Sequence, residues 1–88
     1  MCIRDRINKV VNDEDVISET NKLAMKIAKG PTKAFGGVKE MLRQSFSNGL
    51  ETQMELESQI FSEQLKGLDG PEGIEAFTSK RKPEFKGK

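Results

Sequence analysis

Histidine, tryptophan and tyrosine are absent from this 88-residue sequence, and cysteine occurs once, as Cys2. The lack of histidine removes the commonest general base and the commonest metal ligand. A single cysteine cannot close an internal disulfide, so nothing indicates an oxidising compartment. Because cysteine and histidine form no cluster, we expect no zinc or iron site. No glycine-rich phosphate-binding motif is present either.

Long apolar runs and an excess of charge of one sign are also missing. No segment approaches 18 apolar residues, which argues against a membrane-spanning helix. Fifteen basic and 14 acidic residues leave a formal net charge of +1, so no global field attracts nucleic acid or an anionic membrane. We therefore expect a cytoplasmic protein that binds neither.

The apolar content is small for a globular domain. Leucine, isoleucine, valine and phenylalanine together make up 21 of the 88 residues, which lies above the disordered range. A chain of this length hides only about 60% of its surface when it folds alone. Composition therefore predicts a small helical piece that cannot cover its apolar surface by itself.

The first six residues, Met-Cys-Ile-Arg-Asp-Arg, fit nothing that follows. They are what ATG TGT ATA AGA GAC AGR encodes, which matches the end of a transposase-type sequencing adapter. We expect residues 1–6 to be a non-native segment, with the protein's own N-terminus and any targeting peptide missing. The fold prediction is therefore made for residues 7–88.

Apolar residues at spacings of three, four and seven predict helices. A β-branched run at residues 7–11 predicts the end of a strand whose partners are not in this chain. The first helix follows Asn12 as N-cap and ends at Gly30 and Pro31. The second begins at Thr32, and we expect its Gly36-Gly37 pair to mark close packing against a neighbouring element.

Two more helices follow. Asn48 and Glu51 have the spacing of a capping box, which predicts a third helix that ends near residue 67. Asp69 and Glu72 repeat that spacing and predict a fourth helix over residues 70–81. The helical stripes predict that Phe46, Phe61 and Leu65 pack against other parts of a larger protein, and that Met25, Met41 and Met54 fill gaps in a core.

The carboxylates of the third helix have an ordinary explanation. Glu55 and Glu57 lie on a charged helix, where solvated or ion-paired faces are the norm, so we do not assign them acid–base roles. Glu57 falls within the apolar stripe, which leaves open a partly buried contact with a basic partner. No residue of this sequence is therefore predicted to be catalytic.

A basic segment near the C-terminus allows two interpretations, a solvated tail or an anion site. It comprises Lys80, Arg81, Lys82, Lys86 and Lys88. A phenylalanine, Phe77, precedes Lys80 by three residues, which predicts that both lie on one helix face. A ring beside an ammonium group suits a flat base with a nearby phosphate. The balanced net charge and the lack of a second aromatic residue on that face argue against nucleic acid.

Several strings resemble the C-terminal third of the enoyl-CoA hydratase/isomerase, or crotonase, family. They are INKVV at 7–11, A-x-x-I-A-x-G-P-T-x-A at 24–34, K-E-M-L-R at 39–43, M-E-L-E at 54–57 and E-G-I-E-A-F-x-x-K-R-K-P-E-F-K-G at 72–87. The last string is the most specific. The stretch L-E-T-Q-M-E-L-E at 50–57 is similar to the branch that isomerises the ring epoxide of phenylacetyl-CoA.

The resemblance implies a fold and a role. The fold class it implies is a mainly α fragment: three to four helices after a short strand, forming the C-terminal trimerisation region of an α/β crotonase fold. The catalytic core, with its oxyanion hole and proton-transferring carboxylates, is absent. The whole protein would act on a coenzyme A thioester as substrate, with no further cofactor, as a homotrimer or hexamer.

Two residues are carried over from the family to this sequence. Phe77 and Lys80 align with the aromatic residue and lysine that reach the adenine and phosphate end of coenzyme A. The competing interpretation is a stand-alone helical interaction module, whose apolar stripes bind a partner and which has no connection with acyl-CoA.

Overall fold

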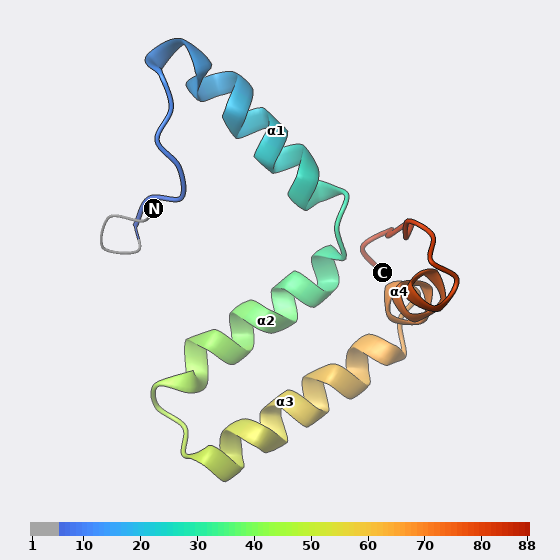
Figure 1. Cartoon of the computed structure of the whole chain (residues 1–88). Helices are drawn as coiled ribbons and strands as arrows, with labels where there is room; N and C mark the ends of the chain where they lie inside the picture. Colours follow the sequence, from blue (N-terminus) through green and yellow to red (C-terminus); the bar gives the residue numbers. More distant parts are fainter. Residues whose placement is uncertain (1–5) are drawn as a thin grey trace.

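The computed structural model describes residues 6–88, which form four α-helices and one short 3-10 turn (Figure 1). The turn η1 covers Asp13–Asp15, and the helices are α1 (Val16–Ala28), α2 (Thr32–Ser45), α3 (Leu50–Leu65) and α4 (Asp69–Thr78). This confirms the mainly helical fold. No strand occurs in the described part of the chain, so the run at residues 7–11 stays irregular, because it has no neighbouring strand to pair with. The expectation for residues 1–6 falls almost entirely outside the described residues.

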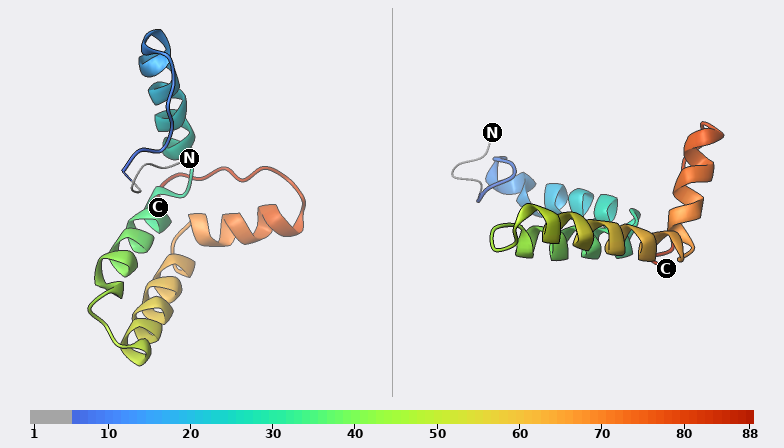
Figure 2. Two further views of the ribbon diagram at one scale, coloured as in Figure 1. Left: turned by 60° about the vertical axis from the view of Figure 1, so that its left-hand side comes forward. Right: turned by 90° about the horizontal axis from the view of Figure 1, so that it is seen from below.

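The helices form an open arrangement. Helices α2 and α3 run antiparallel side by side, α4 projects from the far end of α3, and α1 stands apart (Figures 1 and 2). The radius of gyration is 16.4 Å, whereas a compact domain of this length would have about 12 Å. The chain is therefore less compact than a self-sufficient domain.

Very little of the apolar surface is buried. Ala76 is the only buried apolar residue in the described part, whereas Phe46 is fully exposed and Phe61 is 65% exposed. The chain exposes 7733 Å², and a folded monomer of 9.9 kDa would expose about 5,200 Å². The predicted shortage of internal cover is thus confirmed, and the packing predicted for Phe46, Phe61 and Leu65 within a larger protein stays a prediction.

The turn between α2 and α3 is held by amide side chains rather than by the expected capping box. The N-cap of α3 is Gly49, and no side chain caps the helix. Instead the side-chain N–H of Asn48 donates to Oε1 of Gln53, and Nε2 of Gln53 donates to the carbonyl of Met41, both at 3.1 Å. Close packing is confirmed at Gly37, where an added Cβ would lie 2.8 Å from Ile60, but Gly36 faces open space.

The end of α4 differs from the sequence prediction. The helix stops at Thr78, three residues before Arg81. The N–H of Lys80 donates to the carbonyl of Phe77, and the N–H of Arg81 donates to the carbonyl of Ala76. This pattern is a Schellman motif, in which the chain leaves the helix through a left-handed residue. That residue is Lys80, with φ of 54°, although glycine is the usual choice there.

Residues 82–88, here called the strap, fold back along α4. The carboxylate of Asp69 accepts the backbone N–H groups of Lys86 and Gly87, each at 2.7 Å. The N–H groups of Leu68 and Asp69 donate to the carbonyl of Lys88 at 2.9 and 3.0 Å. The capping role predicted for Asp69 is therefore wrong, because its oxygens bind the strap, and no side chain caps α4.

Glu72 fastens the other end of the strap. Its carboxylate accepts two N–H groups of Arg81, at 2.6 and 3.0 Å, and the backbone N–H of Glu84 at 2.9 Å. The Arg81 guanidinium, helped by the Glu84 N–H, lowers the pKa of Glu72 from 4.5 to about 2. Ionised Glu72 therefore favours the docked strap.

We predict that acid releases Glu84 of the strap from α4, because protonation of Glu72 weakens its hydrogen bond to the Glu84 N–H. Because the folded pKa of Glu72 is depressed, its contribution is fully present above about pH 4.5 and is lost as the pH falls towards 2. The amide signal of Glu84, followed in the folded population of the chain, should titrate with a midpoint near 2. In Glu72→Gln this titration should disappear, whereas Glu75→Gln, the same change on the same helix, should keep it. A midpoint near 4.5 would contradict the prediction.

We also predict that the isolated chain is poorly folded or associates with itself. The exposed area exceeds that of a folded monomer by about 2,500 Å², and specific interfaces bury about 1,200–2,000 Å² in total. Sedimentation should detect oligomers, or the melting temperature should rise with concentration. A monomer with a cooperative melt that is independent of concentration would refute this prediction.

Candidate functional site

Phe77 and Lys80 lie at the C-terminal end of α4. Phe77 belongs to the last turn of the helix, and Lys80 follows the helix. The Phe77 ring is 86% exposed. Because α4 ends at Thr78, Lys80 lies beyond the helix, and the two residues do not share a helix face as their spacing predicts. They stay adjacent through the hydrogen bond from the Lys80 N–H to the Phe77 carbonyl, at 3.2 Å.

An apolar groove of about 470 Å³ lies beside Phe77. Helices α2, α3 and α4 form its walls, and Phe85 of the strap adds a further side. Lys80 is not among its lining residues. The groove is lined by Pro31, Ala34, Val38, Met41, Ile60, Phe61, Gln64, Leu65, Asp69, Gly70, Gly73, Ile74, Phe77 and Phe85.

The structure brings a second aromatic residue to Phe77, which the sequence analysis missed. Phe85 follows Phe77 by eight residues, and the strap turns back so that both rings line the groove. The Phe85 ring lies over Gly73, where an added Cβ would be 3.5 Å from Cε1. No local sequence pattern predicts the contact between Gly73 and Phe85, because the two residues meet only where the chain reverses direction.

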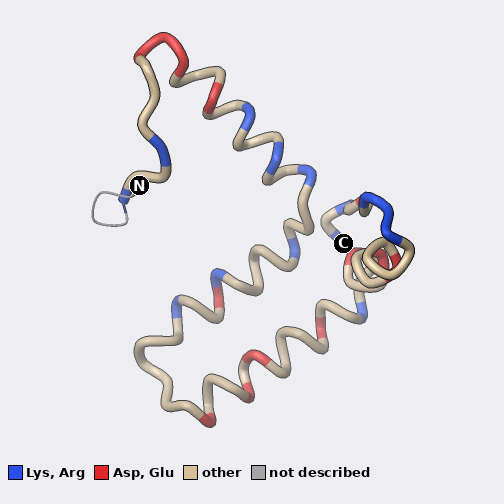
Figure 3. The backbone as a smooth tube through the Cα atoms, viewed as in Figure 1, with Lys and Arg blue, Asp and Glu red and all other residues tan. Residues whose placement is uncertain are grey.

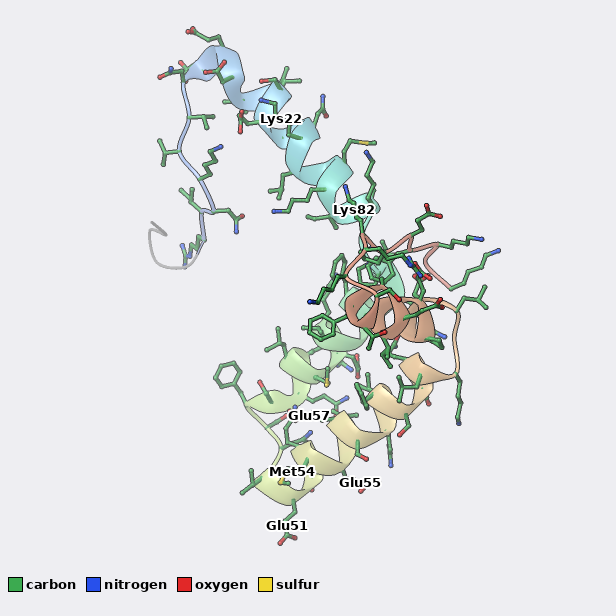
Figure 4. All side chains as sticks on the ribbon, turned by 45° about the vertical axis from the view of Figure 1, so that its right-hand side comes forward. Lys22, Glu51, Met54, Glu55, Glu57 and Lys82 are labelled. Carbon is green, nitrogen blue, oxygen red and sulfur yellow. The ribbon has the colours of Figure 1, made fainter. Side chains whose placement is uncertain are left out.

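The basic segment divides into two groups. Arg81 is engaged by Glu72, which raises the pKa of the guanidinium above its ordinary value. Lys80 has no ion pair within 4.0 Å among residues 6–88. Figure 3 shows the basic residues gathered where the chain leaves α4. Lys82 lies near the end of α1, where it lines a small hollow together with Lys29 (Figure 4).

The acidic residues of α3 form no catalytic arrangement. Glu55 accepts a hydrogen bond from Gln59 at 3.0 Å, and Glu57 is exposed. Figure 4 places both on α3, well away from Lys82. The core-filling role predicted for Met25 and Met54 is not met within this chain, where they are 57% and 61% exposed.

Outside α4, the largest pKa shift in the described part of the chain is that of Glu19 on α1. Glu19 lies 2.6 Å from Nζ of Lys9 and 3.0 Å from Nζ of Lys22, and these two ammonium groups lower the pKa of Glu19 to about 2. Within residues 6–88, no three acidic or cysteine side chains gather as metal ligands. No helix of the described chain is long and apolar enough to cross a membrane.

Known proteins resemble the chain over nearly all of its length. The family model described as enoyl-CoA hydratase/isomerase matches residues 6–88. The 1,2-epoxyphenylacetyl-CoA isomerase of Escherichia coli K12 is 35% identical over 80 residues, covering 91% of this chain and 30% of that protein. A probable enoyl-CoA hydratase of Rhodobacter capsulatus is also 35% identical over 80 residues, covering 91% of this chain and 31% of that protein.

The fold comparison agrees. A crystal structure of an enoyl-CoA hydratase subunit I from Geobacillus kaustophilus HTA426 superposes with a TM-score of 0.85 at 35% identity. The match covers 93% of this chain and 32% of that one. The chain therefore spans about a third of the length of the relatives it matches, as expected for the helical C-terminal region of a larger fold. On the family model, the relatives and the superposed structure together, this chain belongs to the enoyl-CoA hydratase/isomerase family.

Proposed function

We propose that this chain is the C-terminal helical part of a longer enzyme that hydrates or isomerises an acyl-CoA. It supplies packing surfaces between subunits and part of the coenzyme A site, and it carries no catalytic residue. In that enzyme Phe77 lies against the adenine of coenzyme A, and Lys80 approaches one of its phosphates.

The backbone of Lys80 is the observation that carries the proposal. A left-handed conformation costs a residue with a Cβ about 1–2 kcal/mol, and glycine avoids that cost. Strained backbone of this kind is typical of functional positions. A lysine at this position therefore indicates that the side chain has a use. Because it forms no ion pair within residues 6–88, its ammonium group is available to a phosphate.

The exposed ring of Phe77 supports the same assignment. A phenylalanine that is 86% exposed stabilises nothing within this chain, because it buries almost no apolar area. A planar base can stack on such a ring, and an ammonium group beside it can bind the attached phosphate. Coenzyme A carries both groups at the end remote from its thioester.

Finer features of the proposal rest on the relatives. The similarity to 1,2-epoxyphenylacetyl-CoA isomerase favours that branch, and the similarity to the Rhodobacter capsulatus protein keeps a hydratase as the other candidate. The large exposed area supports a homotrimer or hexamer, in which neighbouring subunits and the catalytic core cover the helical faces. A stand-alone interaction module is not favoured, since the family resemblance extends over nearly the whole chain.

We predict that the isolated chain has no hydratase or isomerase activity. Thioester enolates need oxyanion-hole donors and a positioned carboxylate, and the family resemblance places both in the catalytic core, outside the third of the family fold that this chain matches. The measurement is turnover of an enoyl-CoA by the purified chain, with the Escherichia coli relative as positive control. Turnover above that of a mock purification would contradict the prediction.

We predict a selective effect of Lys80 in a hybrid enzyme, in which residues 7–88 replace the matching part of the Escherichia coli relative. Lys80→Ala should raise KM for the CoA ester about three- to tenfold with kcat little changed. A raised KM with an unchanged kcat is expected when the lost interaction stabilises the bound substrate and the transition state equally. Pantetheine esters, which lack the adenosine phosphates, should be unaffected.

Lys80→Gly provides the matched control. It removes the same ammonium group but relieves the left-handed backbone, so it should raise stability by about 1–2 kcal/mol while raising KM as Lys80→Ala does. The two variants should therefore share a raised KM but differ in the free energy of unfolding, which separates the role in binding from the effect on stability. If Lys80→Ala alters CoA and pantetheine esters equally, the residue is structural and the assignment fails.

A further inference from the structure

Asp69 is the one buried charged residue in the described part of the chain, at 6% exposure. Its two carboxylate oxygens each accept a backbone N–H, from Lys86 and from Gly87. A buried carboxylate is costly unless it is fully hydrogen-bonded, so this one needs the strap in place. Among the charged side chains of α4, Asp69 alone hydrogen-bonds to the last residues of the strap, Lys86 and Gly87.

The strap end also fits closely against α2. Gly87 has φ of 74°, and a Cβ added there would lie 2.7 Å from Oγ1 of Thr32. The carbonyl of Lys88 accepts the N–H groups of Leu68 and Asp69. These contacts place the strap between the N-terminal ends of α2 and α4.

Phe85 lies between the two points of attachment. Glu72 holds the strap at Glu84, and Asp69 holds it at Lys86. With both neighbours fixed, the Phe85 ring is fixed over Gly73 and lines the groove that Phe77 also lines. Phe77 and Phe85 thus line one apolar groove, which Phe61 of α3 also lines.

We propose that Asp69 is a positioning residue for coenzyme A binding, which holds Phe85 in the groove wall so that an adenine resting on Phe77 also contacts Phe85. This inference rests on the function proposed above and adds a second aromatic contact to it. Asp69 itself touches no ligand. It acts through the backbone of Lys86 and Gly87.

Asp69→Asn tests the inference with a small change of shape. The amide keeps one acceptor oxygen but turns an NH₂ donor towards the other backbone N–H, so one hydrogen bond is replaced by opposed donors. In the hybrid enzyme, hydrogen exchange at the amides of Lys86 and Gly87 should become about tenfold faster or more, with the helix amides of α2 and α3 unchanged. Glu75→Gln, on the same helix but with an exposed carboxylate, should leave exchange unchanged.

The hybrid enzyme supplies the functional measurement. Asp69→Asn should raise KM for the CoA ester several-fold, and leave kcat and the KM for the pantetheine ester unchanged. Phe85→Leu should raise KM for the CoA ester similarly, since it removes the ring and keeps the strap docked. Gly87→Ala is a second route, because its Cβ displaces the strap from Thr32 while Asp69 stays intact.

The outcomes separate the inference from the proposed function. If Phe77→Ala and Lys80→Ala leave KM for the CoA ester unchanged, the proposed function fails and the inference fails with it. If those two variants raise KM but Asp69→Asn and Gly87→Ala release the strap without raising it, the inference alone is overturned. Equal rises with CoA and pantetheine esters would also overturn it, since that result indicates a general loss of structure.

Discussion

The shortage of buried apolar area governs the structure of this chain. With Ala76 as the only buried apolar residue in the described part, the hydrophobic effect, which normally dominates folding, contributes little to how the helices are placed. Polar contacts between neighbouring elements take its place. The Asn48–Gln53–Met41 contacts hold the α2–α3 turn, and Asp69 and Glu72 hold the strap on α4. Within residues 6–88, no polar side-chain contact joins α1 to the α2–α3 pair, and α1 stands apart.

The same shortage explains the relation of the chain to its family. An amphipathic helix is stabilised mainly by burying its apolar face, and here the faces of α1 and α3 are open. The relatives are about three times as long as the matched region. Open helical faces and a match to about a third of each relative are both what we expect of one part of a larger family domain.

Two strained or costly features lie at opposite ends of α4. Lys80 holds a left-handed backbone, and Asp69 buries a carboxylate. The first aims a cation beyond the helix end, and the second fixes a returning strand of chain against the helix start. Neither would be chosen for stability alone, since glycine and an apolar residue avoid the respective costs. Their position on either side of the two phenylalanine rings is what links local strain to the proposed ligand.

Sequence periodicity was enough to predict the four helices, because the 3.6-residue repeat is written directly in the chain. It also placed the break at Gly30 and Pro31, where proline cannot continue a helix. The order of strings such as E-G-I-E-A-F predicted the family, which the comparisons confirmed. The roles of Phe77 and Lys80 stay predictions of the sequence.

Only the tertiary structure decided what the acidic residues do. Asp69 and Glu72 have the sequence of a helix cap, yet their carboxylates bind residues 9 to 18 positions away. Local spacing cannot reveal this, because the choice between a helix's own N–H groups and those of the strap depends on where the chain returns. The chain reverses direction through the left-handed backbone of Lys80. Lysine seldom adopts this conformation, so the sequence does not predict it. Phe85 reached the groove for the same reason: the distance between side chains was set by the reversal of the backbone, and no periodic pattern records it.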